Sequence, residues 1–565
     1  MKSQRLAACG AVLFLAAACF SSEPPPPGPL LHILADELQR NFQTLQAKAE
    51  PAPYFLSYEV TEQDSRMVAG NLGALQLDDA MHNRHLDVSV RVGTPQLDNY
   101  HRSSGEGGQF ATGAAIALDN EPAALRHSLW LETDRAYRAA SERLIKIRTN
   151  REVKVADRDQ SADFSHEAPA TGSEPVVALD FDTAAWRARV KSLSALFAKY
   201  PDVLVSSVTV IAQTERRTLV TTEGAGLEHG RGFARIIIAA QGKAADGMDL
   251  AASDYFDALQ ARDLPNDAAL AAAVERTAGK LEALLQAPVA EPFVGPAIFS
   301  GRAAGVFFHE IFGHRIEGHR QKDESEGQTF TGSVGASVLP SFLSVVFDPT
   351  RRKAEGIDLN GWYTFDDEGI PARPVTAVEN GVLRNFLMSR SPISGFAQSN
   401  GHGRRQPGRE VVSRQSNLIV QSTRAVTDAE LRQQLIAEIK RQNRPYGLYF
   451  EDVTGGFTNT ARGGLQAFKV LPVIVYRVYA DGRPDEMIRG VDIVGTPLAS
   501  FSKILATSDH TQVFNGYCGA ESGSVPVSAV SPALLISQIE IEKTNKSQDR
   551  PPLLAPPMLT LGMQP

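Results

Sequence analysis

Cysteine is nearly absent from this chain, which has three cysteines among 565 residues. Cys9 and Cys19 lie near the N-terminus, so Cys518 is the one cysteine in the body of the sequence. A lone thiol excludes a scaffold stabilised by disulfides. Cys518 is therefore either a small buried hydrophobic residue, as most free cysteines are, or a metal ligand. Gly516 and Gly519 beside it predict a tight loop that could bring the thiol to another segment of the chain.

The chain also lacks a large excess of either positive or negative charge. The chain has 57 Lys and Arg against 65 Asp and Glu, a net charge of −8 that is small for its length. Surfaces that bind nucleic acids are strongly basic, so this balance argues against a nucleic-acid partner. The content of 43% hydrophobic and 22% charged residues is that of a globular protein, and the length suits two or three domains.

Long hydrophobic runs are confined to the N-terminus, and no later run is long enough to span a bilayer. Two basic residues precede an apolar run over 6–18 that ends in three alanines before Cys19. This pattern is typical of a secretory signal, and the cysteine resembles a bacterial lipoprotein cleavage site, although ordinary cleavage there would look the same. We expect residues 1–19 to be a lipoprotein-type signal peptide and the proline-rich residues 20–29 to be a tether. The mature protein would then be exported to the periplasm of a bacterium or anchored to a membrane through Cys19.

The periodicity of apolar residues predicts an α+β protein of two domains. Helical and strand patterns alternate over residues 30–289, which we expect to form a mixed α/β domain. Three prolines near residue 290 mark the boundary to a strand-rich, largely antiparallel domain over 290–545. Residues 546–565 form a proline-rich tail. The expected helices are 30–49, 121–147, 183–200, 264–285 and 427–443, and the expected strands are 54–61, 86–92, 203–213, 217–222, 233–241, 341–348, 361–366, 375–379, 381–388, 446–452, 464–479, 486–494 and 533–543.

Three local signals refine this outline. Thr427 and Glu430 have the spacing of a capping box at the start of a helix. Asn380 and Gly381 stand between two strand-like runs and predict a tight hairpin. The stretch 361–369 runs from aromatic residues into an acidic turn, which predicts a solvent-exposed hairpin tip.

Two histidines and a glutamate lie close together where the chain reads H-E-I-F-G-H from His309 to His314. Imidazole is the commonest metal ligand, and Glu310 beside it could act as a base on water that a metal activates. In the familiar H-E-x-x-H motif a four-residue step puts both histidines on one helical face. Here the step of five leaves the rings about 140° apart on an ideal helix. A helix that ends early or bulges near Gly313 would direct both rings to one ion.

A catalytic zinc needs three protein ligands and one open position. His319 and Glu317 are the local candidates for the third ligand, and Cys518 is the distant one. His319 is explained equally well as a solvated residue of the basic run 319–322. A zinc-bound cysteine would be protected from oxidation, which would explain a lone thiol in an exported protein. Spacing alone leaves these alternatives open, together with the possibility that the two histidines bind no metal.

Two glycine-containing loops are candidates for substrate binding. Arg404 and Arg405 lie in a basic loop that could grip a carboxylate, such as a peptide C-terminus, or could simply be surface. Gly455 and Gly456 would let the backbone approach a ligand closely. The second loop lacks the lysine and the following helix of a phosphate-binding loop, so it does not predict a nucleotide site.

Several of these motifs occur together in a known order, and as a set they resemble the TldD/PmbA family of bacterial metallopeptidases. The resemblance covers about residues 289–543 and lies on the metal-carrying TldD side, since PmbA-type members lack the metal residues. It implies that one zinc is bound by His309, His314 and Cys518 and that Glu310 is the catalytic base. The motifs that carry it are H-E-x-x-x-H at 309–314, the stretch 361–369, Gly403-Arg404-Arg405, Gly455-Gly456-Phe457 and the loop around Cys518.

The resemblance implies a zinc-dependent peptidase that hydrolyses unfolded or flexible peptides by metal-activated water. It also implies a pair of subunits, either a homodimer or a heterodimer with a PmbA-like subunit. Familiar members are cytoplasmic, so the signal peptide is a departure from the family. One alternative is a membrane-tethered scaffold with a structural or absent metal, but such a protein has no need of Glu310. A metallohydrolase of cell-wall peptides is a further alternative with the same water chemistry.

Overall fold

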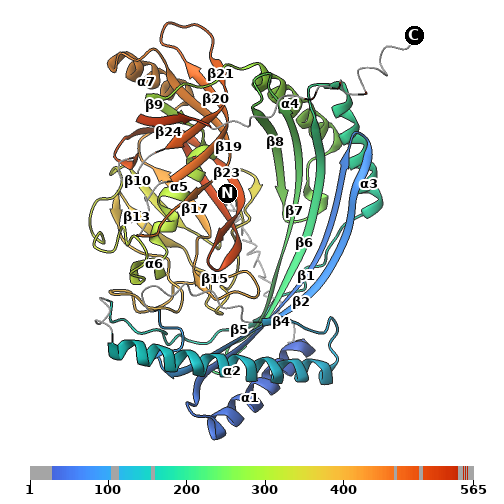
Figure 1. Ribbon diagram of the computed structural model, residues 1–565, viewed down its shortest axis with the longest axis vertical. Helices are drawn as coiled ribbons and strands as arrows, with labels where there is room; N and C mark the ends of the chain where they lie inside the picture. Colours follow the sequence, from blue (N-terminus) through green and yellow to red (C-terminus); the bar gives the residue numbers. More distant parts are fainter. Residues whose placement is uncertain are drawn as a thin grey trace, which may run out of the picture.

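A computed structural model describes residues 28–102, 113–153, 159–462, 468–494 and 500–544, with Pro552, Leu554 and Pro557. The protein is α+β, as the sequence predicts (Figure 1). The expected signal peptide, most of the tether and most of the tail lie outside the described residues. Within the described residues, no helix is long and apolar enough to cross a bilayer.

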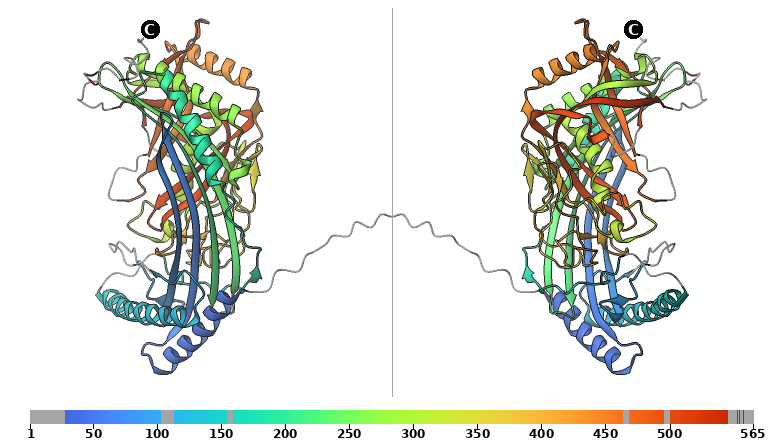
Figure 2. Two further views of the ribbon diagram at one scale, coloured as in Figure 1. Left: turned by 90° about the vertical axis from the view of Figure 1, so that its right-hand side faces the viewer. Right: turned by 90° about the vertical axis from the view of Figure 1, so that its left-hand side faces the viewer.

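The N-terminal half is built on a sheet of long, curved antiparallel strands (Figures 1 and 2). The order is β3-β2-β1-β6-β7-β5, with β4 paired to β2 and β8 paired to β7. Its strands are β1 (Pro53–Asn71), β2 (Ala74–Thr94), β3 (Leu97–Asp98), β4 (Gly113–Ala115), β5 (Thr171–Ser173), β6 (Val205–Thr221), β7 (Gly226–Lys243) and β8 (Asp249–Ala258).

These strands are longer than the sequence predicts. The prediction of two strands at 203–213 and 217–222 is wrong, because β6 continues through both. The prediction for β2 begins at residue 86, whereas β2 begins at Ala74. Every residue over 74–82 is exposed, so no hydrophobic alternation marks this part, and pairing with β1 alone makes it a strand.

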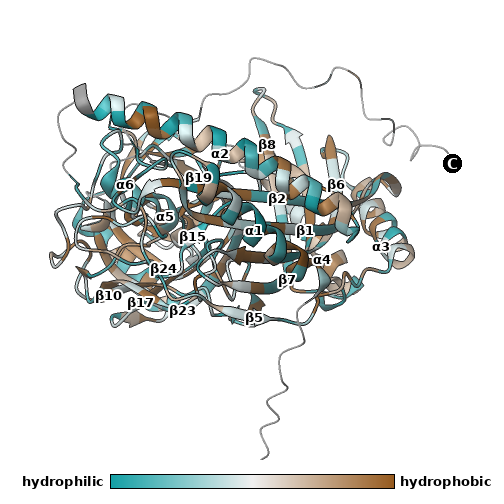
Figure 3. Cartoon of the chain, turned by 90° about the horizontal axis from the view of Figure 1, so that it is seen from below, coloured by the Kyte–Doolittle hydropathy of each residue, from teal (hydrophilic) through white to brown (hydrophobic). Residues whose placement is uncertain are grey.

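Four helices cover this sheet. The helices α3 (Thr183–Ala195) and α4 (Asp267–Gln286) pack on one face through an apolar core. Their N-caps are Asp182 and Asn266, whose side chains accept backbone N–H bonds. The helices α1 (Pro29–Lys48) and α2 (Pro122–Val153) pack at the other end of the strands (Figure 3). All four predicted helices are confirmed, with boundaries shifted by a few residues.

The C-terminal half is built on a twelve-stranded, largely antiparallel sheet, which confirms the predicted strand-rich domain. Pairing of β24 with β9 closes a circuit through β22, β20 and β19. The strands are β9 (Phe293–Phe299), β10 (Leu343–Phe347), β13 (Val375–Glu379), β14 (Val382–Leu383), β17 (Asn417–Ser422), β18 (Ala425–Val426), β19 (Gly447–Thr458), β20 (Phe468–Val478), β21 (Glu486–Ile488), β22 (Val491–Val494), β23 (Ile504–Ala520) and β24 (Gly523–Lys543). Two small pairs, β11 (Lys353–Ala354) with β12 (Ile357–Asp358) and β15 (Gly403–Arg404) with β16 (Val412–Ser413), and the helices α5 (Gly301–Ile311), α6 (His319–Lys322) and α7 (Asp428–Arg441) complete the domain.

Two of the three local signals are confirmed. Thr427 and Glu430 form the capping box of α7. Asn380 and Gly381, with φ of 48° and 81°, make the two-residue turn between β13 and β14. The prediction of an exposed hairpin tip at 361–369 is wrong. This stretch contains no strand and is largely buried, as described next.

Asp366 shows why that acidic stretch is buried. Its carboxylate accepts backbone N–H bonds from Glu368, Ile370 and Gly403, and its exposure is 1%. Three donors replace the water that the carboxylate loses, so the acid is tolerated in the interior. Nothing in the local sequence distinguishes such an acid from one in a solvated turn.

Buried ion pairs join the two domains. Arg217 on β6 pairs with Glu59 on β1 at 3.0 Å and with Asp367 of the C-terminal half at 2.6 Å. Arg405 of the C-terminal half reaches Glu59 at 2.6 Å and Asp87 at 3.7 Å. The C-terminal half is thereby held against the curved sheet, which forms one wall of the cavity described below.

Candidate metal centre

The helix α5 ends where the five-residue spacing of the two histidines requires. It begins at the N-cap Ser300, whose Oγ accepts from the N–H of Ala303, and ends at Ile311. The chain continues as a 3₁₀ turn, η3 (Gly313–Ile316), which carries His314. The predicted early helix end near Gly313 is therefore confirmed. A Cβ at Gly313 would lie 1.9 Å from Oε1 of Gln415, so a larger residue in this turn would have to displace the buried Gln415 side chain.

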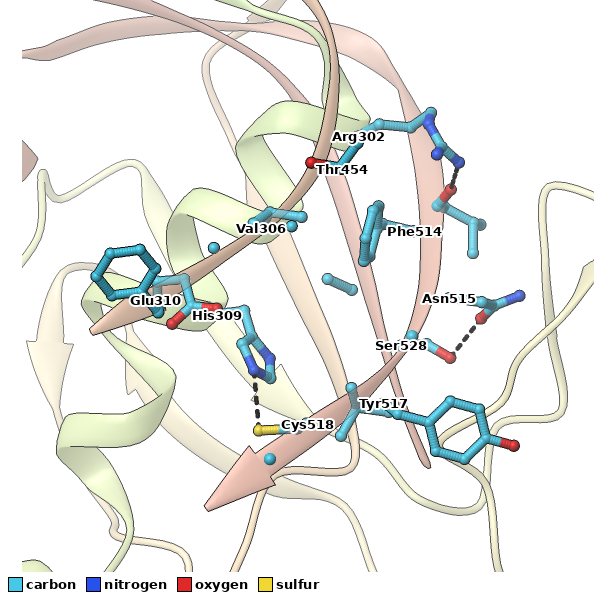
Figure 4. A pocket seen from close by; sticks show the side chains of 18 of the residues that line it. Arg302, Val306, His309, Glu310, Thr454, Phe514, Asn515, Tyr517, Cys518 and Ser528 are labelled. Carbon is cyan, nitrogen blue, oxygen red and sulfur yellow. Dashed lines mark hydrogen bonds between the residues drawn. The ribbon is translucent and has the colours of Figure 1, made fainter. Parts of the chain in front are cut away.

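Two histidines and a cysteine from distant segments meet beside this turn. The Nε2 atom of His309 lies 3.2 Å from Sγ of Cys518 (Figure 4). The Nε2 atom of His314 lies 3.3 Å from the same sulfur. The three ligand atoms lie within 4.8 Å of one another, and all three side chains are buried. Cys518 belongs to β23, which packs against α5. Two imidazoles and a thiolate are a donor set that suits zinc and leave a fourth position open, so the residues fit a catalytic zinc.

Electrostatics favour the thiolate form of Cys518. Burial alone would raise the pKa of this thiol, but the positive charges of His314 and His309 outweigh burial and lower the pKa well below its ordinary value. Burial disfavours the charged form of His314, yet the neighbouring Cys518 and Glu317 raise its pKa well above the ordinary value. The thiolate is the form that binds metals. The site is therefore arranged to hold a positive charge between its three ligands.

Glu310 lies beside the ligands without being one of them. Its Oε2 atom is 4.0 Å from Nε2 of His314, and its side chain is 8% exposed. Burial raises the pKa of Glu310, and the nearby His309 acts in the opposite direction. A Cβ at Gly456 would lie 2.7 Å from Cγ of Glu310, so glycine at this position on β19 gives the carboxylate its room.

The ligands open onto a cavity of about 760 Å³, a size that suits a ligand site. Arg302, Val306, His309 and Glu310 of α5 share one helical face on its wall (Figure 4). Both domains contribute to the remaining walls: Arg235, Tyr255 and Asp257 from the N-terminal sheet, Thr454 to Ala461 from β19 and the residues after it, and Val513 to Glu521 with Val527 to Ala529 from β23, β24 and the turn between them.

Of the four residues predicted to bind substrate, the two glycines line the cavity and the two arginines do not. Gly455 and Gly456 line the cavity, as their prediction as substrate-binding residues requires. Arg404 and Arg405 do not line it, because the guanidinium groups of both are turned to the protein itself. Arg404 donates to the carbonyl oxygens of Gln415 at 2.6 Å and Pro526 at 2.8 Å. The interpretation of these two arginines as substrate-binding residues is therefore corrected to a structural role.

The two local alternatives for the third ligand are also placed outside the triad. His319 hydrogen-bonds through Nε2 to the carboxylate of Glu521, and no ligand atom of His319 joins the group of three. Glu317 faces the opposite side of the ring, where its Oε2 lies 3.3 Å from Nδ1 of His314. Glu317 therefore contacts His314, a candidate ligand, and is not part of the group of three.

Sequence reasoning missed Arg414 and Gln415. Both have 0% exposure, and they contact the segments that carry the three ligands. They belong to the polar run Ser413 to Asn417, whose composition is that of a surface loop, so no local signal could have identified them.

Comparisons with known proteins find relatives of the part of the chain that carries these residues. Residues 294–543 match the family model of the PmbA/TldA metallopeptidase C-terminal domain. A metalloprotease TldD homolog from Haemophilus influenzae is 26% identical over 266 residues, which are 46% of this chain and 51% of that protein. A zinc metalloprotease TldD homolog from Saccharolobus solfataricus is 25% identical over 248 residues, 44% of this chain and 51% of that protein. The chain thus spans about half the length of the curated relatives that it matches.

A solved structure shows the same fold over nearly the whole molecule. TldE from Thermococcus kodakarensis superimposes with a TM-score of 0.62 at 13% identity, over 90% of this chain and 100% of that chain. The likeness therefore includes the N-terminal domain, which the family model does not cover.

Proposed function

We propose that this chain is a TldD-like, zinc-dependent peptidase of the PmbA/TldD family that hydrolyses unfolded or flexible peptides. The observation that carries the proposal is the convergence of His309, His314 and Cys518 at one wall of a large cavity, with Glu310 beside them. The names of the relatives, which are metalloproteases and in one case a zinc metalloprotease, support the same chemistry.

Glu310 would be the general base. A zinc ion held by the three ligands would act as a Lewis acid that lowers the pKa of water and polarises the scissile carbonyl. Glu310 would accept the proton of the attacking water and deliver it to the leaving amine. A pKa raised by burial suits a carboxylate that must both accept and donate a proton. A scaffold with a purely structural metal would have no use for a buried carboxylate at this position.

The strand β19 offers a binding edge for an extended peptide. Over Gly455–Thr458 it pairs with β20 on one side, while its pairing with β9 is confined to Leu448–Phe450. Within the described part of the chain, the remainder of that second edge has no strand partner. An added peptide strand would be held through its backbone, which favours flexible peptides of varied sequence. A hydrolase of cell-wall peptides would use the same chemistry and is distinguished by assay of both substrate types.

Export and pairing are parts of the proposal that rest on the sequence. Residues 1–19 have the pattern of a lipoprotein signal and would place the enzyme in the periplasm, with or without an anchor at Cys19. We infer a homodimer or a heterodimer with a PmbA-like subunit. Light scattering of the purified chain alone distinguishes the two, since only a homodimer doubles the mass without a partner.

Replacement of Glu310 by Gln tests the proposal. The amide cannot accept the proton, so cleavage of a denatured-protein peptide mixture should fall by about 10²–10⁴-fold. Zinc content should stay at the wild-type level because Glu310 is not a ligand. A matched control is Glu275→Gln on the exposed side of α4, which should keep full activity. Full activity in Glu310→Gln with zinc bound would contradict the proposed role.

A further inference from the structure

The buried run from Ser413 to Asn417, which joins the end of β16 to the start of β17, contacts the segments of all three proposed metal ligands. We infer that Arg414 and Gln415 of this run, with Glu317 as an intermediary, position His309, His314 and Cys518 for metal binding. The inference rests on the proposed metal site and adds to it the residues that hold its geometry.

Arg414 sets the place of Cys518. Its Nη2 donates to the carbonyl oxygen of Cys518 at 2.5 Å. Its Nη1 donates to Oγ of Ser522 at 2.7 Å and to the carbonyl oxygen of Gly523 at 3.0 Å. One rigid guanidinium thus holds the end of β23, which carries Cys518, and the start of β24, which follows it after a turn.

Arg414 also reaches His314 through Glu317. Its Nε lies 3.5 Å from Oε1 of Glu317, whose Oε2 lies 3.3 Å from Nδ1 of His314. Neither Nε of Arg414 nor Oε1 of Glu317 has a hydrogen bond within the described residues, and Oε2 of Glu317 accepts from Nε of Arg320 at 2.8 Å. The buried carboxylate is therefore compensated by two arginines, of which Arg414 is the one that also contacts the cysteine strand. A carboxylate on Nδ1 holds the imidazole with Nε2 toward the metal position and makes it a better ligand.

Gln415 holds the third ligand. Its Nε2 donates to the carbonyl oxygen of His309 at 3.2 Å. Its side-chain oxygen lies 1.9 Å from the position that a Cβ of Gly313 would take, so the amide packs directly on the turn between the two histidines. Arg414 and Gln415 therefore hold two segments that are about 200 residues apart in the sequence. One is the end of α5 and the turn after it, with both histidines, and the other is the strand with Cys518.

Supporting residues of this kind change metal affinity by about 10–100-fold when they are altered. We expect Arg414→Lys, Glu317→Gln and Gln415→Leu each to weaken zinc binding within that range in competition with a chelator of known affinity. The cobalt-substituted variants should show a weakened or shifted thiolate-to-metal absorption band, because the angle between the ligands changes. Because Arg414 and Glu317 act along one path, the double variant should lose less affinity than the product of the two single losses.

Arg405→Lys is the matched control, since Arg405 is also a buried arginine, and it pairs with Glu59 rather than with the metal segments. It should lower the Tm of the zinc-free protein and leave the zinc affinity unchanged. Wild-type zinc affinity and an unchanged cobalt spectrum in all three single variants, with only a lower Tm, would overturn this inference and leave the peptidase proposal standing. A folded wild type that binds neither zinc nor cobalt would overturn both.

Discussion

Gly456 on β19 lies directly against Glu310 on α5, with the position of a Cβ at Gly456 only 2.7 Å from Cγ of Glu310. The carbonyl oxygen of Lys469 would lie 3.0 Å from the same Cβ, so a methyl group has no free direction. The proposed base therefore keeps its position because residue 456 has no side chain.

Gly456→Ala should consequently impair catalysis more than metal binding. The added methyl would displace the Glu310 carboxylate, and a misplacement of about 1 Å can cost about 100-fold in rate. We expect kcat to fall while zinc content stays near the wild-type value. Gly279→Ala is the control, because a Cβ on this helical residue meets nothing within 4 Å. Equal activity of the two variants would show that Glu310 does not need this space.

His402 should make stability depend on pH. It is fully buried between Asn400 and Ser416, and burial lowers its pKa to about 3. The unfolded chain binds a proton at this residue below pH of about 6.5, whereas the folded chain does not. The stability is therefore complete above that pH and is lost progressively as the pH falls toward the folded pKa.

Between pH 7 and pH 5 this difference amounts to about 2 kcal/mol in the free energy of unfolding. Urea unfolding at both pH values measures it. His402→Gln should lose stability at pH 7 and should show a smaller further loss at pH 5 than the wild type. His166, which is exposed, gives the control His166→Gln with wild-type behaviour. An identical loss on acidification in wild type and His402→Gln would exclude His402 as the source.

Replacing Arg405 tests whether this arginine stabilises the fold or binds substrate. Arg405→Met leaves Glu59 with one of its two arginines removed, and breaking a buried pair costs about 3–5 kcal/mol. We expect a lower free energy of unfolding and an unchanged KM for peptides at a temperature where the variant is folded. A raised KM with unchanged stability would restore the interpretation of Arg405 as a substrate contact.

The residues proposed as metal ligands could be singled out from the sequence, for reasons found in particular residues. The step from His309 to His314 does not fit a continuous helix, and Gly313 marked the place where the helix ends. Cys518 stood out because the body of the chain has no other cysteine. Its assignment as third ligand nevertheless required the family resemblance, because sequence spacing cannot bring β23 to α5.

Other features could not be predicted because their local sequence resembles a solvated surface. The first residues of β2 are exposed and are held only by pairing with β1. Asp366 is buried because backbone N–H groups, among them that of Gly403, replace the water around its carboxylate. Arg405 is buried because Glu59, from the other half of the chain, replaces the water around its guanidinium group. The burial of Arg414 could not be predicted for the same reason, since its hydrogen-bond partners lie about 100 residues away in the sequence. Buried polar contacts between distant segments carry no periodicity for a sequence pattern to report.

Cys19 tests the proposed export. If residues 1–19 are a lipoprotein signal, the protein made in a bacterial host should fractionate with membranes and incorporate labelled fatty acid. Cys19→Ala should abolish the label and leave the protein unprocessed or soluble in the periplasm. Absence of label in the wild type, with cleavage intact, would indicate an ordinary secretory signal.

Metal content of the purified protein tests the central claim most directly. Elemental analysis should be carried out on wild type, Cys518→Ser and Glu310→Gln, each made without residues 1–19. The account predicts about one zinc per chain in the wild type and in Glu310→Gln, with loss of zinc in Cys518→Ser, because Cys518 belongs to the proposed ligand set and Glu310 does not. A folded wild type without metal, or Cys518→Ser with a full complement of zinc, would contradict it.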